Sequence, residues 1–394
     1  MLLCVVLVVV PCSADLWQPE QLPFTLDGGT SVGFAVDSSG APGFTFRTLT
    51  GSSPTTGLYY GYQSAGSWTS ELVQTGGGTG AGSYLLYDGT TPYISYGAGG
   101  PFDIDLTVAT GGPGAWSTTT LVDTDHPRHT MLGLDANGNL GLGWIDQVAN
   151  QLGYIYHDGA DWSSPEIVDT QPRVLAGLSV LLPGSVEDAS IAYSQFDGTF
   201  FYAPTLASRQ SDDDWDLDVG LGGTATFDDA GYLAGVVTDS GNPALCFMDT
   251  WTGNIVYTEF DGTTWHSETV VELETLTAYA DDRYLDMARD DWGNIHLLYL
   301  NTDTRQVEYR FRTSEGDWSG ARVLHQGEST WMRLAIDDTQ APWFAYYSRD
   351  DERLHYGVGA PVPEPATTAL FAMGLLSAIG FARRNRKTSG REQS

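Results

Sequence analysis

The chain has 394 residues, of which 50 are Asp or Glu and 18 are Lys or Arg, giving a formal net charge of −32. A body this acidic repels polyanions, which excludes nucleic acid as a ligand for the body as a whole. The 47 glycines and 12% aromatic residues favour many short strands joined by tight turns, so the composition predicts an all-β protein.

A short apolar run, Leu2 to Val10, opens the chain and is followed by Pro11 to Ala14. An apolar segment of this length that ends in small residues is typical of a secretory signal peptide. We therefore expect residues 1–14 to direct export and to be cleaved after Ala14, so that the body begins at residue 15.

Between its ends the chain repeats itself with a period near 50 residues, which is typical of propellers and other repeat arrays. Tryptophan marks the repeat, and each tryptophan precedes a short segment in which polar residues give way to apolar ones, as in Trp265 to Val270. The marker tryptophans, separated by 51, 48, 46, 53, 50 and 53 residues, are Trp17, Trp68, Trp116, Trp162, Trp215, Trp265 and Trp318. The spacing indicates one structural unit per tryptophan.

Two further landmarks divide each unit into strands. An aspartate turn lies between two apolar alternations, as at Asp135 to Gly138, where Asp or Asn followed by Gly supplies the positive φ of a tight turn. A tyrosine-rich strand, such as Leu152 to Tyr156, precedes the tryptophan. Four strands per unit make one propeller blade. The other turns of this kind are at Asp37, Asp239, Asp290 and, without glycine, Asp337.

The two ends of the array complement each other. The last unit stops at Tyr356 before any tryptophan strand, whereas Trp17 to Leu22 precedes the first inner strand and has no blade of its own. We expect this N-terminal strand to complete the last blade, which closes the ring and removes an open edge. Residues 15–360 are therefore predicted to form a seven-bladed β-propeller, and a weak turn at Pro183 to Asp188 leaves a count of six or eight open.

The units resemble bacterial propellers of the sialidase-like and lectin-like kind, whose repeats pair a Gly-x-x-Trp turn with an aromatic strand. The resemblance covers nearly the whole predicted propeller as a pattern. Phe260 to Trp265 and Tyr156 to Trp162 look like the Asp box of sialidases, but both lack its leading serine and are one residue short. No Arg-Ile-Pro element opens the first blade, so the catalytic arginine of that family is not carried over.

Arginines lie where one blade passes to the next, and such loops converge on the axial channel of a propeller. Arg128 and Arg283 each stand seven residues before the turn aspartate of their blade, which makes their positions equivalent. Guanidinium groups suit carboxylate, sulfate or phosphate, so a ring of them could hold an acidic sugar, while neutralisation of neighbouring aspartates is the structural alternative. The candidate ligand-binding residues are Arg128, Arg173 and Arg283, with Trp331 and Arg333 as a stacking wall or as core.

The sequence holds no Gly-x-Ser-x-Gly, P-loop or nucleotide fingerprint. Asp125, His126 and His129 resemble a metal-ligand spacing, but no further ligand is identifiable, which favours a solvated loop. The run Asp212 to Asp218 could meet calcium through its oxygens, but it lacks the Gly-centred loop of a cation site, which favours a solvated strand edge. We expect no cofactor, with calcium as the one candidate ion.

Residues 361–394 have three parts: Val362 to Pro365, an apolar run at 366–382, and a basic cluster. The apolar run would rise about 25 Å as a helix, at the short limit for crossing a bilayer, and the basic cluster would hold that end in the cytoplasm. This order resembles the PEP-CTERM sorting signal, which is also found at the C-terminus of some ice-binding proteins. The residues that carry the resemblance are Pro363, Glu364, Pro365, Arg383 and Arg384.

The resemblance implies processing by an exosortase and transfer to the cell envelope, the outer surface or the exopolysaccharide matrix, with anchoring in the membrane by the C-terminal helix before processing. A plain single-span anchor is the alternative. The predicted activity is non-catalytic binding of a glycan or an envelope protein, with an acidic glycan as the candidate ligand of the arginines. A glycoside hydrolase or lyase at the channel mouth is the alternative from the enzyme class, and a structural matrix component is the third.

Overall fold

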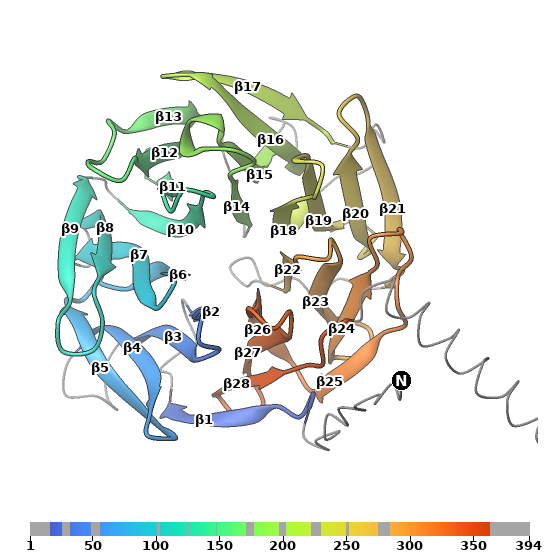
Figure 1. The fold of residues 1–394 in the computed structure, drawn as a ribbon, viewed down its shortest axis with the longest axis horizontal. Coiled ribbons are helices and arrows are strands. Elements are labelled where there is room, and N and C mark those ends of the chain that lie inside the picture. The colour runs from blue at the N-terminus through green and yellow to red at the C-terminus, as the bar shows by residue number, and fades with distance from the viewer. Residues whose placement is uncertain are drawn as a thin grey trace, which may run out of the picture. The chain divides into compact units, whose positions relative to one another are not determined.

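The computed structural model describes residues 16–362 apart from 26–31, 49–55, 101–102, 124–125, 147, 171–176, 197–201, 222–229, 250–251 and 275–283. In this part of the chain the strands form seven four-stranded antiparallel sheets around a central axis (Figure 1), which confirms the predicted seven-bladed β-propeller. The propeller belongs to the first of two units, residues 1–360 and 361–394. The predicted signal peptide and the apolar run at 366–382 lie outside the described residues. Within the described residues, no helix has the length and apolar character needed to span a bilayer.

The strands of each blade follow one another from the axis to the rim. Blade one holds β2 (Gly33–Val36), β3 (Pro42–Thr48), β4 (Gly57–Ser64) and β5 (Ser67–Thr75), and blade two holds β6 (Ala81–Asp88), β7 (Thr91–Gly99), β8 (Ile104–Thr110) and β9 (Ser117–Val122). Blade three holds β10 (Pro127–Leu134), β11 (Leu140–Asp146), β12 (Gln151–His157) and β13 (Glu166–Asp169). Blade four holds β14 (Leu178–Leu181), the short 3₁₀ helix η1 (Val186–Asp188), β15 (Ser190–Phe196), β16 (Tyr202–Ser211) and β17 (Asp214–Val219). Blade five holds β18 (Ala230–Val237), β19 (Pro243–Asp249), β20 (Ile255–Phe260) and β21 (Trp265–Val271). Blade six holds β22 (Leu285–Arg289), β23 (Ile295–Asn301), β24 (Gln306–Arg312) and β25 (Arg322–Gln326), and blade seven holds β26 (Ser329–Ile336), β27 (Pro342–Ser348), β28 (Arg353–Val358) and β1 (Glu20–Thr25).

Blade seven is closed by the N-terminal strand, as predicted. Strand β1 pairs antiparallel with β28, so that Glu20 lies opposite Tyr356 and Gln21 opposite His355. Just before β1, the backbone N–H of Trp17 donates to the carbonyl of Val358 at 2.8 Å. The first and last strands of the propeller therefore share one sheet, and the ring has no open edge at its junction.

Four of the five predicted aspartate turns between the two inner strands share one hydrogen-bond pattern. At Asp37, Asp135, Asp290 and Asp337 the aspartate Oδ1 accepts the backbone N–H groups two and four residues later, as Asp135 does from Asn137 at 2.8 Å and Asn139 at 2.9 Å. The turn at Asp239 differs, because there the Thr238 hydroxyl donates to the carbonyl of Asn242 at 3.0 Å. Glycine with φ near 80° follows at Gly40, Gly138 and Gly293. The turn at Asp337 has Gln340 at this position with φ 63°, and its side chain exchanges hydrogen bonds with Asp291 of blade six. These bonds offset the cost of a left-handed non-glycine residue.

The marker tryptophans link neighbouring blades at the rim. In most blades the indole N–H donates to a side chain on the preceding blade. The pairs are Trp68 to Tyr356 at 3.1 Å, Trp116 to Glu71, Trp215 to Glu166 at 3.0 Å, Trp265 to Asp218 at 2.8 Å and Trp318 to Glu268 at 2.9 Å. Trp17 instead lies under the guanidinium of Arg322, with 4.8 Å from Cζ to its ring centroid. The repeat seen in the sequence is therefore a repeat of contacts between blades.

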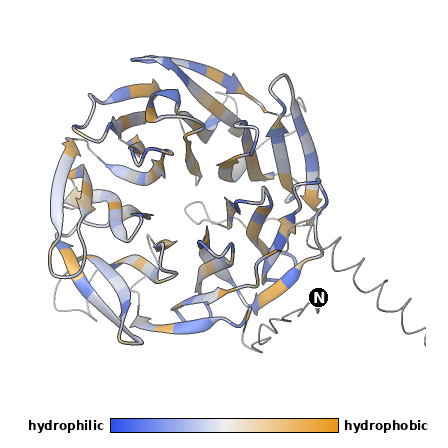
Figure 2. Cartoon of the chain, viewed as in Figure 1, coloured by the Kyte–Doolittle hydropathy of each residue, from blue (hydrophilic) through white to orange (hydrophobic). Residues whose placement is uncertain are grey.

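Burial differs between the middle and the outer strands of a blade, and the sequence explains why. The middle strand β11 is buried along its whole length and is made of apolar residues and glycine apart from Asp146. The outer strand β9, with sequence STTTLV, exposes its first four residues. Figure 2 shows hydrophobic residues along the strands of the blades. Their buried side chains form clusters that join neighbouring blades, and each large side chain contributes about 1.5–3 kcal/mol on burial.

Candidate functional site

The predicted ligand-binding arginines are only partly within the described residues. Arg128 lies at an irregularity of β10, and its side chain is not described. Arg173 and Arg283 lie outside the described residues, so the predicted arginine ring stays a prediction. Trp331 and Arg333 are described, and both lie on β26, the innermost strand of blade seven.

Trp331 packs into the apolar core and Arg333 reaches toward the axis. The Trp331 side chain joins a cluster of buried residues that includes Tyr347 and Tyr356, and it is 7% exposed. Arg333 is 2% exposed, and its Cζ lies 5.6 Å from the ring centroid of Tyr84 on the innermost strand of blade two. The structure therefore places one of the predicted cations among the innermost strands.

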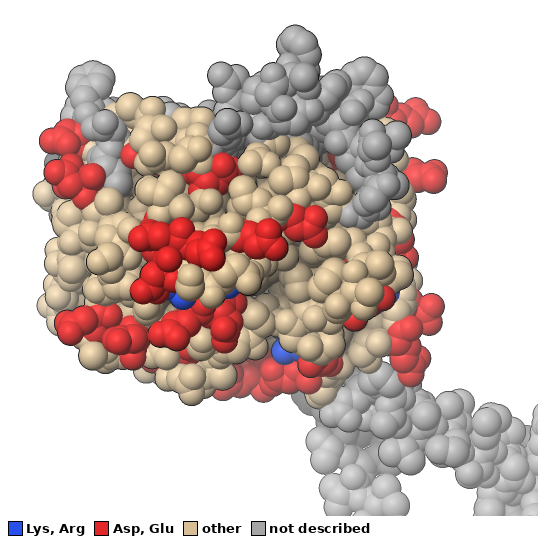
Figure 3. All heavy atoms as spheres, turned by 90° about the horizontal axis from the view of Figure 1, so that it is seen from above, with Lys and Arg blue, Asp and Glu red and all other residues tan. Residues whose placement is uncertain are grey.

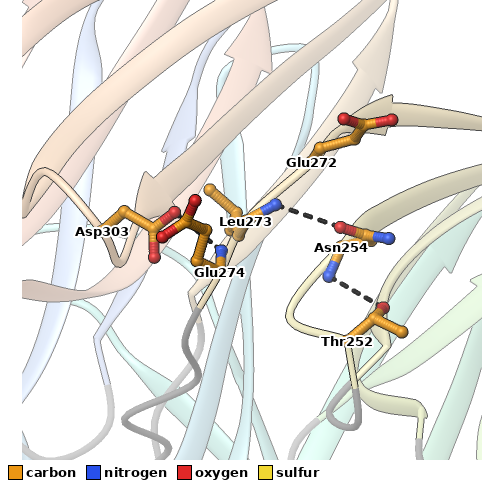
Figure 4. A pocket seen from close by; sticks show the side chains of 6 residues that line it. All are labelled: Thr252, Asn254, Glu272, Leu273, Glu274 and Asp303. Atoms are coloured by element: carbon orange, nitrogen blue, oxygen red, sulfur yellow. Dashed lines mark hydrogen bonds between the residues drawn. The ribbon is translucent and has the colours of Figure 1, made fainter.

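A hollow that the sequence did not indicate lies between blades five and six (Figure 4). Its volume is about 580 Å³, within the range of ligand pockets. Its lining comes from the loop between β19 and β20, from the segment after β21, and from the loop between β23 and β24. The lining residues are Thr252, Asn254, Glu272, Leu273, Glu274 and Asp303. Three carboxylates, one amide, one hydroxyl and one apolar side chain thus face a single space.

Hydrogen bonds hold the segments that line the hollow, and some of the lining side chains form no hydrogen bond to the described part of the chain. The N–H of Leu273 donates to Asn254 Oδ1 at 3.0 Å, and the N–H of Glu274 donates to Asp303 Oδ2 at 2.8 Å. The Thr252 hydroxyl donates to the buried Asp249 at 2.6 Å. The Asn254 amide nitrogen and the exposed carboxylates of Glu272 and Glu274 have no partner among the described residues. The hollow therefore offers one amide donor and two free carboxylates to a ligand.

The charge of the hollow decides what it can accept. Its lining contains three carboxylates and no cation. The body as a whole is also acidic, and Figure 3 shows one side of it with many Asp and Glu and few Lys or Arg. Carboxylates repel anions and accept hydrogen bonds from hydroxyl or ammonium groups. The hollow therefore suits a neutral or amino-bearing ligand rather than the acidic sugar expected of the arginines.

A second acidic group lies on blade two, where ligand oxygens of Asp103, Asp105 and Asp123 are all within 4.8 Å of one another. Burial together with the charges of Asp123 and Asp103 raises the pKa of Asp105. The predicted calcium run at 212–218 forms no such group within the described residues. Two of its aspartates instead bind side chains, Asp212 with Arg209 and Asp218 with Trp265.

Comparison with known proteins gives one sequence match and several fold matches. Residues 361–387 match the PEP-CTERM protein-sorting motif. This confirms the predicted sorting signal, indicates an exported, surface-sorted protein and implies processing by an exosortase. No curated protein matches the chain.

Solved structures with the same fold have low sequence identity. An ulvan lyase of polysaccharide lyase family 25 is 14% identical, with a TM-score of 0.55, and the match covers 87% of this chain and 96% of the lyase. The six-bladed fucose-binding lectin of Aleuria aurantia is 13% identical, with a TM-score of 0.47 over 72% of this chain and 94% of the lectin. The Hadza microbial sialidase Hz136 is 14% identical, with a TM-score of 0.48 over 78% of this chain and 74% of the sialidase. At 14% identity, the similarity to the lyase shows the propeller fold alone.

Proposed function

We propose that this protein is a non-catalytic, surface-sorted propeller that binds a neutral or amino-bearing glycan in the hollow between blades five and six. The observation that carries the proposal is the set of unengaged hydrogen-bonding groups around one concave space, the Asn254 amide and the carboxylates of Glu272 and Glu274. The sorting motif supports it, because a surface protein meets extracellular polysaccharide.

The chemistry of the lining fits the hydroxyl groups of a sugar. A carboxylate accepts hydrogen bonds from neighbouring hydroxyls, and the Asn254 amide nitrogen can donate to a ring or hydroxyl oxygen. Leu273 is buried at 6% exposure and gives the hollow an apolar wall. Hydrogen bonds from the backbone already hold Asn254 and Asp303 in place, so little side-chain freedom is lost on binding.

Glycan-array binding of the full chain, purified in detergent, tests the proposal, with calorimetry on the sugars that bind. We expect neutral or amino sugars to bind, and Asn254→Ala to weaken the affinity for the best ligand several-fold, because a neutral hydrogen bond contributes about 0.5–1.5 kcal/mol. Glu315→Gln, which removes the same kind of charge at an exposed turn of blade six, is the control for Glu274→Gln.

Three results would overturn the proposal. One is a failure of any neutral or amino sugar to bind. Another is binding that Asn254→Ala and Glu274→Gln leave unchanged. The third is release of reducing ends or unsaturated products from a bound polysaccharide, which would favour the hydrolase or lyase alternative. A glycosidase would then need two carboxylates at defined separation, and Glu272 and Glu274 would be the pair to replace.

A further inference from the structure

Arg333 is a cation buried without a counter-ion. It is 2% exposed, its Nε has no hydrogen-bond partner, and Nη1 donates only to the carbonyl of its own neighbour Met332, at 3.3 Å. No ion pair joins it to a carboxylate in the described part of the chain. A guanidinium carries five N–H donors, and burial of an unpaired charge is costly. Most of the donors of Arg333 are therefore unused.

A β-bulge places a second unused polar group on the same face of β26 as Arg333. Thr330 is 2% exposed, and its hydroxyl has no hydrogen-bond partner. In a regular strand, residues three apart point to opposite faces. Here Thr330 lies opposite Tyr347 and Arg333 opposite Ala345, so one extra residue is inserted on β26 and both side chains share one face.

The extra residue of this bulge is held in an unfavourable conformation. Trp331 has φ 54°, in the left-handed region that bulky side chains rarely adopt. Its indole is anchored in the apolar core, which stabilises the bulge. Backbone strain of this kind is retained where it positions functional groups, and here it puts Thr330 and Arg333 on one face of the sheet.

Three blades converge on Arg333. It extends from blade seven to the ring of Tyr84 on blade two, and the negative charge of Asp286 on blade six acts on it. These neighbours do not replace a counter-ion. Asp286 Oδ2 accepts the backbone N–H of Leu334 at 2.9 Å, and the tyrosine ring offers no oxygen lone pair to Nε through its face. Burial lowers the pKa of Arg333, because the surroundings solvate its charged form less well than water does.

We propose that Arg333 and Thr330, backed by the ring of Tyr84, form an axial site for an oxyanion, with the carboxylate of an acidic sugar as its natural occupant. The guanidinium edge donates two parallel hydrogen bonds to the oxyanion, and the Thr330 hydroxyl donates a third. The site uses blades two and seven, whereas the hollow uses blades five and six. An acidic group at the axis and a neutral sugar in the hollow are therefore separate binding events.

Thermal unfolding of the full chain in Tris-chloride tests this site, with glucuronate and sulfate as probes and glucose as the neutral control. We expect glucuronate to raise the Tm of the wild type by about 4 °C at a hundredfold excess over Kd, and glucose to leave it unchanged. In Arg333→Met the rise disappears, and the Tm without anion equals or exceeds that of the wild type, because an unpaired buried charge has been removed. Thr330→Val keeps the fold and weakens the binding of glucuronate at least severalfold.

Controls separate this site from general salt effects and from the hollow. Arg289→Met removes a cation whose ion pair with Asp239 is partly exposed, and it keeps the glucuronate response. Asn254→Ala also keeps it, even if that variant has lost sugar binding in the hollow. If glucuronate binds at least tenfold more tightly than sulfate, the occupant is an acidic sugar. If the two affinities are equal, the occupant is a free inorganic oxyanion at the same site.

Two results would overturn the axial site. One is an anion-induced rise in Tm that is equal in the wild type and in Arg333→Met. The other is a Tm of Arg333→Met well below that of the wild type together with no anion response in either protein. The second result would make Arg333 a structural cation held by Tyr84 and Asp286.

Discussion

Two arginines are buried in the described part of the propeller, and their surroundings are opposite. Arg209 on β16 is 9% exposed and Arg333 on β26 is 2% exposed. The Nε and Nη2 groups of Arg209 donate to both carboxylate oxygens of Glu166 at 2.8 to 3.1 Å, and its Nη1 donates to the carbonyl of Glu187. Arg333 has one long hydrogen bond, from Nη1 to the carbonyl of Met332 at 3.3 Å. The hydrogen bonds to Glu166 raise the pKa of Arg209, whereas burial lowers that of Arg333.

The difference between the two arginines separates a structural position at the rim from an irregular position at the axis. Glu166 also accepts the indole N–H of Trp215, so Arg209 belongs to the tryptophan links that join blades at the rim. The Nε, Nη1 and Nη2 groups of Arg209 and the indole N–H of Trp215 all have acceptors. At the axis, a bulge of blade seven interrupts the strand and leaves donors unused. Departures from local rules are expected at functional sites, which is why we place binding at Arg333 and stability at Arg209.

The largest effect is expected from removing the partner of Arg209. Glu166→Ala leaves a buried guanidinium with only an exposed aspartate and a carbonyl, and it should lower the free energy of unfolding by about 3–5 kcal/mol in a urea titration. Asp212→Asn, at a side chain 88% exposed, should cost less than about 1 kcal/mol. If Glu166→Ala lowers the free energy of unfolding no more than Asp212→Asn does, Arg209 is not stabilised by its buried partner and the contrast with Arg333 is wrong.

A smaller effect is expected at the rim links. Trp318→Phe removes the indole bond to Glu268 and should cost about 1 kcal/mol more than Trp162→Phe, because Trp162 forms no indole hydrogen bond to the described residues. Both changes remove similar apolar area, so their difference in urea isolates the hydrogen bond. Equal losses would show that these tryptophans act through packing alone.

The smallest effect is a change in acid sensitivity at an aspartate turn. Burial of Asp290 would raise its pKa, but hydrogen bonds from His296 and Asn294 outweigh burial and hold the pKa below its ordinary value. A depressed folded pKa contributes stability above the unfolded value of about 3.9, and this contribution is lost as the pH falls through the folded value. Asp290→Asn should therefore flatten the loss of Tm below pH 4. An unchanged slope would show that this carboxyl does not control acid unfolding.

Much of the fold follows from the sequence because the repeat is carried by residues whose contacts are local or lie one blade away. The tryptophan spacing predicts the blades, and the unpaired strand at Trp17 to Leu22 predicts the closure at Tyr356. Even the weak turn of blade four is explained, since Ser185 caps a 3₁₀ helix there.

The sites could not be predicted in the same way. The hollow is lined by three segments from two blades, and none of them carries a motif. At the axis, the sequence identified Arg333 but not its neighbours, because Tyr84 lies on a distant blade. The bulge at Trp331 has no sequence signal, since neither glycine nor asparagine occupies the left-handed position. Strand alternation alone would have placed Thr330 and Arg333 on opposite faces.

The most direct measurement is a crystal structure of the protein soaked in selenate, with anomalous scattering used to locate the anion. The expected result is a selenium peak whose oxygens lie within hydrogen-bonding distance of the Arg333 Nε and the Thr330 hydroxyl, and its loss in Arg333→Met. An empty axis at a selenate concentration that saturates the rise in Tm, or an Arg333 side chain paired with Asp286 instead, would contradict the axial site.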